Sequence, residues 1–283
     1  LTEDWPDEQR LFFDEMAASR DAWNASFCCG SCSIARRAAL NAIGGFPTAS
    51  ITEDLLTTLC MLREGYRTVY LNEKLSMGLA AESISAYFVQ RERWCRGGIQ
   101  SIYLREGPLG PGLNLIQRLL FFPVSWVIQY PVRFMLLAVP IVYLLFGLAP
   151  LQFTTISDIL FFQMPVFAAY TMLMRWLVRE KYFPILSTAI AIFATFRLLP
   201  TVVFSLIKPF GVPFRVTPKG SLTVAGVTDP FTFFAIMTFI ILTLAGLAIN
   251  MIPEYQVLPY MEFFPVAAFW SCINLLMLMV AFL

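Results

Sequence analysis

Polar and apolar positions are distributed unevenly along the 283 residues of the chain. Residues 1–110 hold most of the acidic and basic side chains, whereas residues 119–283 are dominated by Phe, Leu, Ile, Val and Met. A helix needs about 20 mainly apolar residues to span a membrane. Runs that meet or approach this length lie at 119–148, 159–174, 231–252 and 263–283. The pattern therefore predicts a water-soluble part joined to a helical membrane part.

The basic residues set the expected orientation of these four runs. They precede the first run, follow the second and precede the third, whereas the loops at 149–158 and 253–262 carry no Lys or Arg. Cytoplasmic loops of membrane proteins carry an excess of positive charge. We therefore expect residues 1–110, residues 175–230 and the C-terminus on the cytoplasmic side.

A further apolar segment, 183–207, has Arg197 near its middle and basic residues on both flanks. A single crossing would place one basic flank outside. We therefore expect this segment to lie in the membrane interface as an amphipathic helix. The alternative is a fifth span that inverts the last two.

The polar part of the chain is expected to contain short elements of both kinds. Helices are predicted at 33–41, from Thr52 as N-cap through Leu62, and at 83–102. The alternation at 68–71 is typical of a strand. The expected fold class is therefore a partial mixed α/β domain followed by an α-helical transmembrane region with an interfacial helix.

The residue types present exclude several kinds of chemistry. There is no histidine, which excludes imidazole bases, histidine-containing metal sites and Ser-His-Asp triads. Acid–base chemistry must therefore rest on Asp, Glu, Lys, Tyr or Cys. Cys29 and Cys32 form a CxxC pair, but a single pair is a weak metal or redox signal, and we expect plain half-buried thiols. The net charge is +1 and no nucleic-acid-binding motif is present, so no nucleic-acid partner is expected.

The predicted helix at 83–102 gathers binding chemistry on one face. Gln90, Arg93, Trp94 and Gly97 are spaced i, i+3, i+4 and i+7. Arginine makes bidentate bonds to phosphate, and an indole offers a flat apolar surface that suits a sugar ring. A juxtamembrane anchor for anionic lipid is the competing interpretation, and composition alone favours it.

Four motifs, in order along the chain, resemble those of the processive family 2 glycosyltransferases of the bacterial cellulose synthase kind. The matching stretches are Phe27-Cys28-Cys29-Gly30-Ser31 (F-F-C-G-S in the family), Thr52-Glu53-Asp54 (T-E-D), Gln90 to Trp94 (Q-x-x-R-W) and Phe214 to Lys219 (F-x-V-T-x-K). Cys28 stands where the family motif has its second Phe. The resemblance covers essentially the whole chain.

The resemblance implies a GT-A-type glycosyltransferase domain, of which this chain holds the later part. It implies inverting transfer of glucose from UDP-glucose onto a growing β-glucan, which then crosses the bacterial inner membrane through the helices. Cellulose (β-1,4) and curdlan (β-1,3) both stay open as products, and synthesis of another β-polysaccharide from UDP-GlcNAc is an alternative. A non-catalytic membrane channel or scaffold is the alternative from another class.

The resemblance also implies roles for single residues. Asp54 is the expected general base, which takes a proton from the acceptor hydroxyl. The residues expected to bind the UDP part of the donor are Gln90, Arg93, Phe214, Val216, Thr217 and Lys219. Those expected along the acceptor and glucan path are Cys29, Glu53, Trp94, Trp126 and Tyr130. For Trp126 and Tyr130, an aromatic belt at the membrane interface is the open alternative.

The expected layout has four parts. These are 1–110, the later half of a cytoplasmic glycosyltransferase domain with an interfacial helix carrying QRERW; 111–182, two transmembrane helices; 183–230, an interfacial helix and an FRVTPK gating loop; and 231–283, two transmembrane helices. Mg²⁺ or Mn²⁺ is expected, with its ligands in a preceding part of the protein, so no metal ligand is named in this chain. The expected partners are UDP-glucose, the nascent β-glucan, the lipid bilayer and accessory subunits; no PilZ domain for c-di-GMP is matched.

Overall fold

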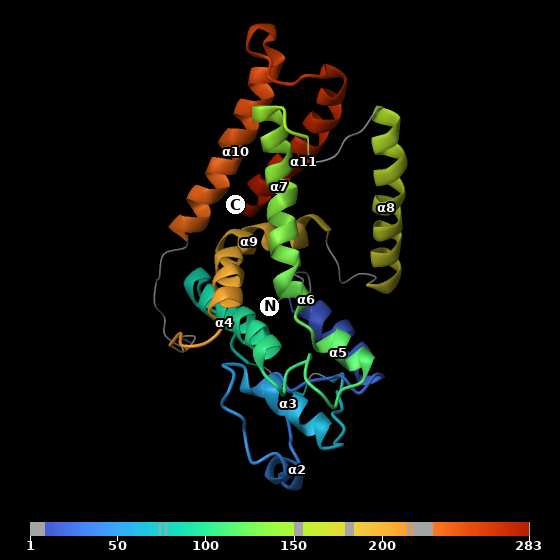
Figure 1. The fold of residues 1–283 in the computed structure, drawn as a ribbon, viewed down its shortest axis with the longest axis vertical. Coiled ribbons are helices and arrows are strands. Elements are labelled where there is room, and N and C mark those ends of the chain that lie inside the picture. The colour runs from blue at the N-terminus through green and yellow to red at the C-terminus, as the bar shows by residue number, and fades with distance from the viewer. Residues whose placement is uncertain are drawn as a thin grey trace. The chain divides into compact units, whose positions relative to one another are not determined.

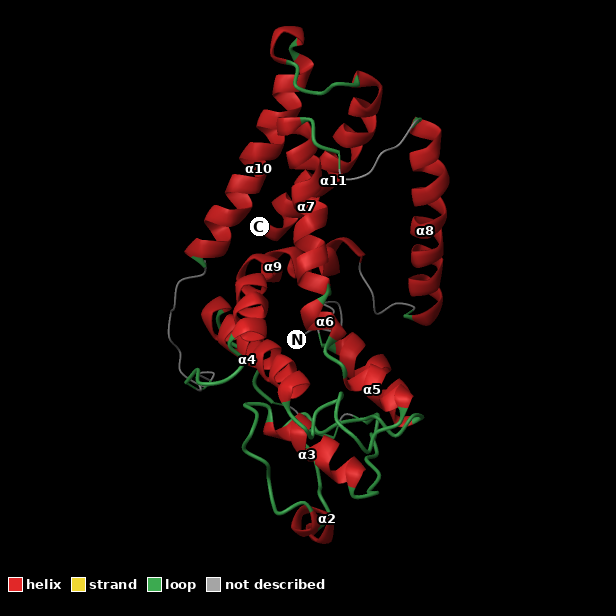
Figure 2. Cartoon of the chain, in the orientation of Figure 1, coloured by secondary structure: helices red, strands yellow, loops and turns green. Residues whose placement is uncertain are grey.

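The computed structural model describes residues 9–73, 75–76, 78–149, 155–178, 184–213, 216 and 229–282. Within these ranges the chain consists of helices and loops, without a strand (Figure 2). The chain separates into two compact units. The first consists of Leu1–Tyr130 and Leu198–Thr228, and the second consists of Pro131–Arg197 and Asp229–Leu283.

The first unit contains short helices and one long helix, α4 (Figure 1). Its elements are η1 (Phe12–Ala17), α1 (Ala18–Asp21), α2 (Arg37–Ala42), α3 (Glu53–Arg63), α4 (Ile84–Tyr103), α5 (Leu115–Phe121) and α6 (Val124–Val127). The helix predicted at 83–102 is confirmed as α4. Ser83 is its N-cap, and the Ser83 hydroxyl accepts a hydrogen bond of 3.2 Å from the backbone N–H of Ala86.

The helix α3 begins at the predicted position, but not through the predicted bond. Thr52 is the N-cap residue, and Glu53 and Asp54 occupy the first turn. The Thr52 side chain makes no capping bond, and its hydroxyl instead lies 3.1 Å from the hydroxyl of Ser50. The start of α3 is therefore fixed by the loop before it rather than by its own cap.

The strand predicted at 68–71 is wrong. A strand needs backbone partners for its N–H groups. Here the N–H of Thr68 donates to Asn24 Oδ1 at 3.2 Å, and the N–H of Tyr70 donates to Asp21 Oδ1 at 2.8 Å. Side chains thus take the place of a neighbouring strand, and the α/β character expected of this part is not confirmed in the described ranges.

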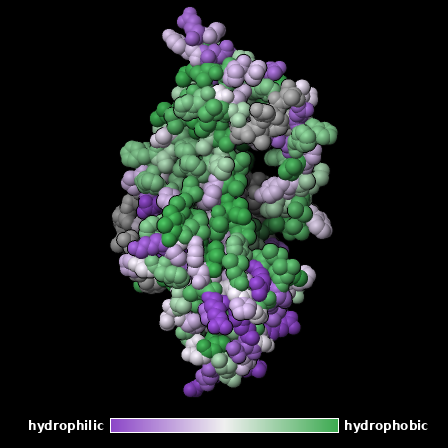
Figure 3. All heavy atoms as spheres, viewed as in Figure 1, coloured by the Kyte–Doolittle hydropathy of each residue, from purple (hydrophilic) through white to green (hydrophobic). Residues whose placement is uncertain are grey.

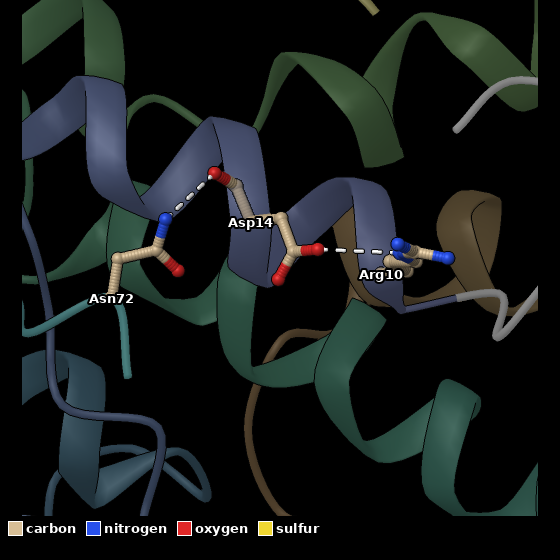
Figure 4. A network of polar contacts seen from close by, with 3 residues as sticks. All are labelled: Arg10, Asp14 and Asn72. Atoms are coloured by element: carbon tan, nitrogen blue, oxygen red, sulfur yellow. Dashed lines mark hydrogen bonds and ion pairs between the residues drawn. The ribbon is translucent and has the colours of Figure 1, made fainter. Parts of the chain in front are cut away.

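The segment after Tyr70 is fastened in the same way. Asn72 Nδ2 donates to the backbone oxygen of Asp14 in η1 at 3.2 Å, and Asp14 Oδ2 pairs with Arg10 at 3.3 Å (Figure 4). Asp14 and Asn72 lie 58 positions apart in the chain. Polar side chains therefore hold the non-helical segments of the first unit to its helices.

The helix predicted at 33–41 is shorter than expected. Arg36 has φ −66° and ψ 125°, so its backbone is not helical, and α2 begins only at Arg37. The predicted glycine stop is confirmed, because Gly44 and Gly45 both have positive φ and the N–H of Gly45 returns to Leu40 O at 2.8 Å.

The second unit is made of long apolar helices (Figure 1). They are α7 (Gln129–Phe146), α8 (Ile156–Leu177), α9 (Pro184–Ile207), α10 (Pro230–Met251) and α11 (Phe264–Phe282), of which α7 begins and α9 ends in the first unit. Leu137, Ile192, Phe196, Ile236 and Leu278 form the buried core cluster where α7, α9, α10 and α11 pack. Figure 3 shows hydrophobic residues over much of the surface of the long helices, as expected for helices that face lipid.

Within the described residues, five helices are long and apolar enough to cross a membrane. Four of them are the predicted spans. The first span is shorter than the predicted 119–148, since Pro123 separates α5 from α6 and the apolar helix runs over Val124–Phe146. The fifth is Ile185–Ile207, within α9. Length and composition alone do not distinguish a span from an interfacial helix, so the interfacial position stays a prediction, as do the four-part layout and the orientation.

Candidate active site

The carboxyl group of Asp54 lies where the first turn of α3 meets the loop at 27–31. Its Oδ1 accepts a hydrogen bond of 2.8 Å from the N–H of Leu55. On the other side, a Cβ added to Gly30 would lie 3.1 Å from Asp54 Oδ2, and Gly30 has φ +81°. A glycine is needed there both for the left-handed backbone and for the close approach to the carboxylate. The structure thus brings the second and first motifs together.

Thr58 fixes this arrangement from within α3. Its hydroxyl donates to the backbone oxygen of Asp54 at 3.2 Å and accepts from the N–H of Cys28 at 3.0 Å. Phe27 packs edge-on against Phe121, with ring centroids 6.4 Å apart. Sequence reasoning missed Thr58, and its position four residues after Asp54, one helical turn on, is the signal that would have found it.

The groups around Asp54 act on the pKa of its carboxyl in opposite directions. Burial is the largest effect and raises the pKa of the Asp54 carboxyl, and the negative charge of Glu53 adds to this rise. The Leu55 N–H and the positive charge of Arg93 act in the lowering direction. The net pKa is raised. The charge of Arg93 is the smallest of these effects. The helix α4, which carries the third motif, meets the second motif where Gly97 lies against the side chain of Thr52.

Cys29 lies in the same surroundings, and its thiol is uncharged at neutral pH. Burial, followed by the charges of Asp54 and Cys28, raises the pKa of the Cys29 thiol to about 12, against a lowering effect of Arg20. A thiol with such a pKa is protonated at neutral pH and is a poor nucleophile. Cys29 can therefore line the space beside Asp54, but it does not compete with the carboxylate as a base.

The helix α4 packs closely against the start of α3. A Cβ added to Gly97 would overlap the side chain of Thr52. Gly97, one of the four residues predicted to share a face, thus allows contact with the T-E-D motif rather than with a ligand. The buried Gln100, one turn further along α4, accepts hydrogen bonds from Ser50 Oγ and from the N–H of Ile51. Sequence reasoning missed both Ser50 and Gln100.

Trp94 is half-buried on α4 and has a cation on its face. The guanidinium of Arg91 lies 4.6 Å from the Trp94 ring centroid and 5.0 Å from that of Tyr87. Such a cation–π contact contributes about 0.5–1 kcal/mol at an exposed site and more when it is desolvated. A role for Trp94 as the platform under the acceptor sugar stays a prediction.

Trp126 and Tyr130 stack on each other, with ring centroids 5.8 Å apart and an angle of 18°. They pack against the buried Cys95 and Ile99 of α4, and Trp126 lies close to Gly98, where an added Cβ would be 3.0 Å from Trp126 Cδ1. The pair is therefore part of the apolar packing against the C-terminal half of α4. Contact of this pair with a glucan stays a prediction.

The remaining predicted site residues differ in the burial of their side chains. Gln90 is half-buried on α4, and Glu53 is exposed at the start of α3. Of the F-x-V-T-x-K motif, Val216 is described and is exposed, whereas Phe214, Thr217 and Lys219 lie outside the described residues. Their roles at the donor stay predictions.

The described part of the chain offers no group of three or more His, Cys, Asp or Glu side chains that could hold a metal ion. The donor set that Mg²⁺ or Mn²⁺ prefers, several carboxylate oxygens, is not present among these residues. No metal ligand is therefore assigned among the described residues.

Comparison with known proteins places this site in a family. Residues 8–97 match the family model described as "Glycosyltransferase like family 2". This stretch contains three of the four motifs.

Among curated proteins, "Cellulose synthase 2" of Novacetimonas hansenii is 31% identical over 282 residues, which is 97% of this chain and 17% of that protein. The "Cellulose synthase 1 catalytic subunit" (UDP-forming) of Komagataeibacter xylinus is 42% identical over 144 residues, 50% of this chain and 19% of that protein. The corresponding catalytic subunit of Xanthomonas axonopodis pv. citri is 44% identical over 116 residues, 41% of this chain and 16% of that protein. The chain thus spans less than a fifth of the length of these relatives.

Proposed function

Because the chain is a cellulose synthase-like member of glycosyltransferase family 2, we propose that it is part of a processive inverting β-glucan synthase. The enzyme takes glucose from UDP-glucose and adds it to a polymer that crosses the bacterial inner membrane. The observation that carries the proposal is the packing around the T-E-D segment, where Gly30 of the first motif approaches the Asp54 carboxylate and Gly97 of α4, the helix of the third motif, lies against Thr52.

Asp54 acts as the general base in a single displacement. The acceptor hydroxyl attacks the anomeric carbon of the donor glucose, the bond from that carbon to the UDP oxygen breaks, and the hydroxyl proton moves to Asp54. Since the sugar is α-linked in the donor, the product is a β-glycoside. A carboxylate whose pKa is raised by burial is a stronger base than an exposed one, which supports this role.

The leaving UDP gains negative charge as this bond breaks, and Arg93 supplies a fixed positive charge next to the reacting groups. Gln90, three residues before Arg93 on α4, adds a neutral donor on the same side of the helix. Phe214, Val216, Thr217 and Lys219 complete the donor site by the family resemblance. Mg²⁺ or Mn²⁺ bound by the full-length protein would add positive charge at the diphosphate.

Asp54→Asn in the full-length protein tests the proposal. We expect loss of polymer formation by about 10²–10⁴-fold, while binding of UDP stays within about twofold because the amide keeps the shape of the side chain. Polymer is measured by incorporation of labelled glucose from UDP-glucose in membrane vesicles, and binding by titration calorimetry. Glu64→Gln, a substitution at the exposed carboxylate that follows the last residue of α3, is the matched control and should retain most activity. A full-length protein that binds no UDP and makes no polymer would instead support a channel or scaffold. Synthesis retained with Asp54→Asn would rule out Asp54 as the general base.

The glycosidic linkage of the product is the more specific part of the proposal. The relatives are named cellulose synthases, which favours β-1,4-linked product over the β-1,3-linked curdlan. Digestion of the product by a β-1,4-specific glucanase, with resistance to a β-1,3-specific one, is the expected result. Incorporation of GlcNAc in place of glucose would point to the other polysaccharide class.

A further inference from the structure

The side chain of Gln100 joins three separate segments of the first unit. Gln100 lies on α4, ten residues after Gln90, and is only 4% exposed. Its Oε1 accepts from Ser50 Oγ at 3.2 Å and from the N–H of Ile51 at 3.0 Å. Its Nε2 donates to the backbone oxygen of Pro209 at 2.7 Å. No motif of the family resemblance includes this residue.

The oxygen end of the amide leads to the general base. Ser50 Oγ, which bonds to Gln100, accepts from the N–H of Thr52 at 3.2 Å and lies 3.1 Å from the Thr52 hydroxyl. Thr52 is the residue from which α3 starts, two positions before Asp54. Because Thr52 makes no side-chain cap of its own, its position depends on Ser50. Ser50 Oγ is held by Gln100 Oε1 at 3.2 Å and, at the longer distance of 3.4 Å, by the backbone oxygen of Gly97.

The nitrogen end fixes which way the amide points. A backbone carbonyl can only accept, so Pro209 O must face the Nε2 group, and Oε1 must then face Ser50 and Ile51. A second bond between the same two segments, from the hydroxyl of Tyr103 to Leu206 O at 2.7 Å, holds the C-terminal end of α9 on α4. The amide therefore cannot turn over without losing its bonds to the N–H of Ile51 and to Pro209 O.

We propose that Gln100 is a positioning residue for Asp54, acting through Ser50 and Thr52 on the start of α3. The proposal rests on the proposed function, since it assigns Gln100 to the same reaction. A base acts on the proton only in the transition state, so a displaced Asp54 lowers turnover and leaves the affinity for the donor unchanged.

Gln100→Met tests this by keeping the length of the side chain and removing its polar atoms. In the full-length protein we expect kcat, counted per UDP-binding site, to fall about tenfold, with the KM for UDP-glucose within about twofold. Gln100→Glu keeps the acceptor oxygen for Ile51 and should restore part of the lost kcat. The matched control is Ser101→Ala, which removes a buried bond of 2.6 Å to Gly98 O that stays within α4; its kcat per site should be unchanged.

A double-mutant cycle shows whether Gln100 acts through Ser50. If it does, Ser50→Ala combined with Gln100→Met loses little more kcat than Gln100→Met alone. An unchanged kcat per site with Gln100→Met, an equal loss with Ser101→Ala, or full additivity with Ser50→Ala would each overturn the proposal. Polymer synthesis by the wild type is the reference for these comparisons. If the wild type makes no polymer, the proposed function itself is refuted, and not only the positioning role of Gln100.

Discussion

The two units of the molecule differ in how far their structure depends on single polar side chains. In the second unit, apolar side chains from α7, α9, α10 and α11 share one buried cluster, and the loss of one contact leaves many others. The helices of the first unit also pack through apolar clusters, but single polar side chains fix its loops: Gln100 and Thr58 hold the surroundings of Asp54, and Asn24 holds Thr68. A site built in this way has accurate geometry but little redundancy. Small changes in the first unit should therefore affect turnover, and those in the second unit should affect stability.

The largest expected effect is the dependence of activity on the protonation of Asp54. The pKa of this carboxyl is raised above its ordinary 3.8, and only the ionised form accepts a proton. Activity should therefore fall on the acid side at a pH above that value, as measured by kcat/KM for UDP-glucose against pH. An acid limb at or below 3.8 would contradict the role of burial at this site.

The raised pKa of the Asp54 carboxyl also affects the stability of the fold. A carboxyl whose folded-state pKa is raised stabilises the fold at low pH, and that contribution is lost as pH rises through the folded pKa. At neutral pH the ionised Asp54 therefore costs stability. Asp54→Asn should leave the thermal unfolding temperature equal to or above that of the wild type, measured in detergent at pH 7. A clear drop would show that the carboxylate stabilises the fold instead.

A pair of glycine substitutions compares the two units directly. Gly97→Ala forces Cβ into the side chain of Thr52, and Gly246→Ala places Cβ 2.8 Å from Leu144 Cβ. Overpacking costs about 1–3 kcal/mol in either case, against a gain of about 1 kcal/mol in helix propensity. We expect similar losses of stability, but kcat per folded molecule should fall about tenfold only with Gly97→Ala, since displacement near a reacting group is costly.

Gly98→Ala serves as the control for this pair, because its Cβ would meet Trp126 Cδ1 at 3.0 Å, a less severe contact. The stability of each variant is measured by thermal unfolding in detergent, and folded protein is counted by UDP binding. Equal losses of kcat with Gly97→Ala and Gly246→Ala would remove the distinction between the two units.

Asn250 shows what a buried amide does in the second unit. It is 1% exposed, its Nδ2 donates to Leu144 O at 2.6 Å, and its Oδ1 accepts from the N–H groups of Val257 and Leu258. Asn250→Leu leaves those two N–H groups without this acceptor, at a cost of about 1–3 kcal/mol each.

We expect Asn250→Leu to lower the unfolding temperature while kcat per folded molecule stays within about twofold. Asn274→Leu, which removes a single bond of 3.2 Å to Leu136 O, is the control and should have a smaller effect on unfolding. A selective loss of kcat with Asn250→Leu would give this amide the same kind of role as Gln100.

The difference between the units also explains which parts of the fold the sequence predicts. The long helices of the second unit follow from apolar length alone, because a backbone in lipid must satisfy its own hydrogen bonds. The helix α4 follows from its periodicity and from Ser83. The segment at 68–71 was predicted wrongly, because its partners are the side chains of Asn24 and Asp21, and a local pattern carries no information on such distant partners.

The candidate site shows the same limit. The motif residues Asp54 and Arg93 could be identified by resemblance, and the helices that carry them, α3 and α4, meet at Thr52 and Gly97. The residues that hold them could not, because Gln100 contacts Ser50 across 50 positions and Pro209 across 109. Such contacts depend on how α4 packs, which the motif spacing does not specify.

The smallest expected effect concerns the exposed thiols, and it tests the assignment of one unit to water and the other to lipid. Cys32 in the first unit and Cys272 on α11 are both exposed in the structure. Hydrogen bonds from Ser76 and Ser31 lower the pKa of the Cys32 thiol, which raises its thiolate fraction at pH 8. Cys272 lies within the apolar helix Met261–Phe282, where a charged reagent is excluded by lipid.

In membrane vesicles opened to both sides, a charged thiol reagent should modify Cys32 rapidly and Cys272 slowly, as counted by mass spectrometry of the peptides. Synthesis should change little in either case. Ser76→Ala should slow the reaction at Cys32, and rapid modification of Cys272 would contradict a lipid-facing position for α11.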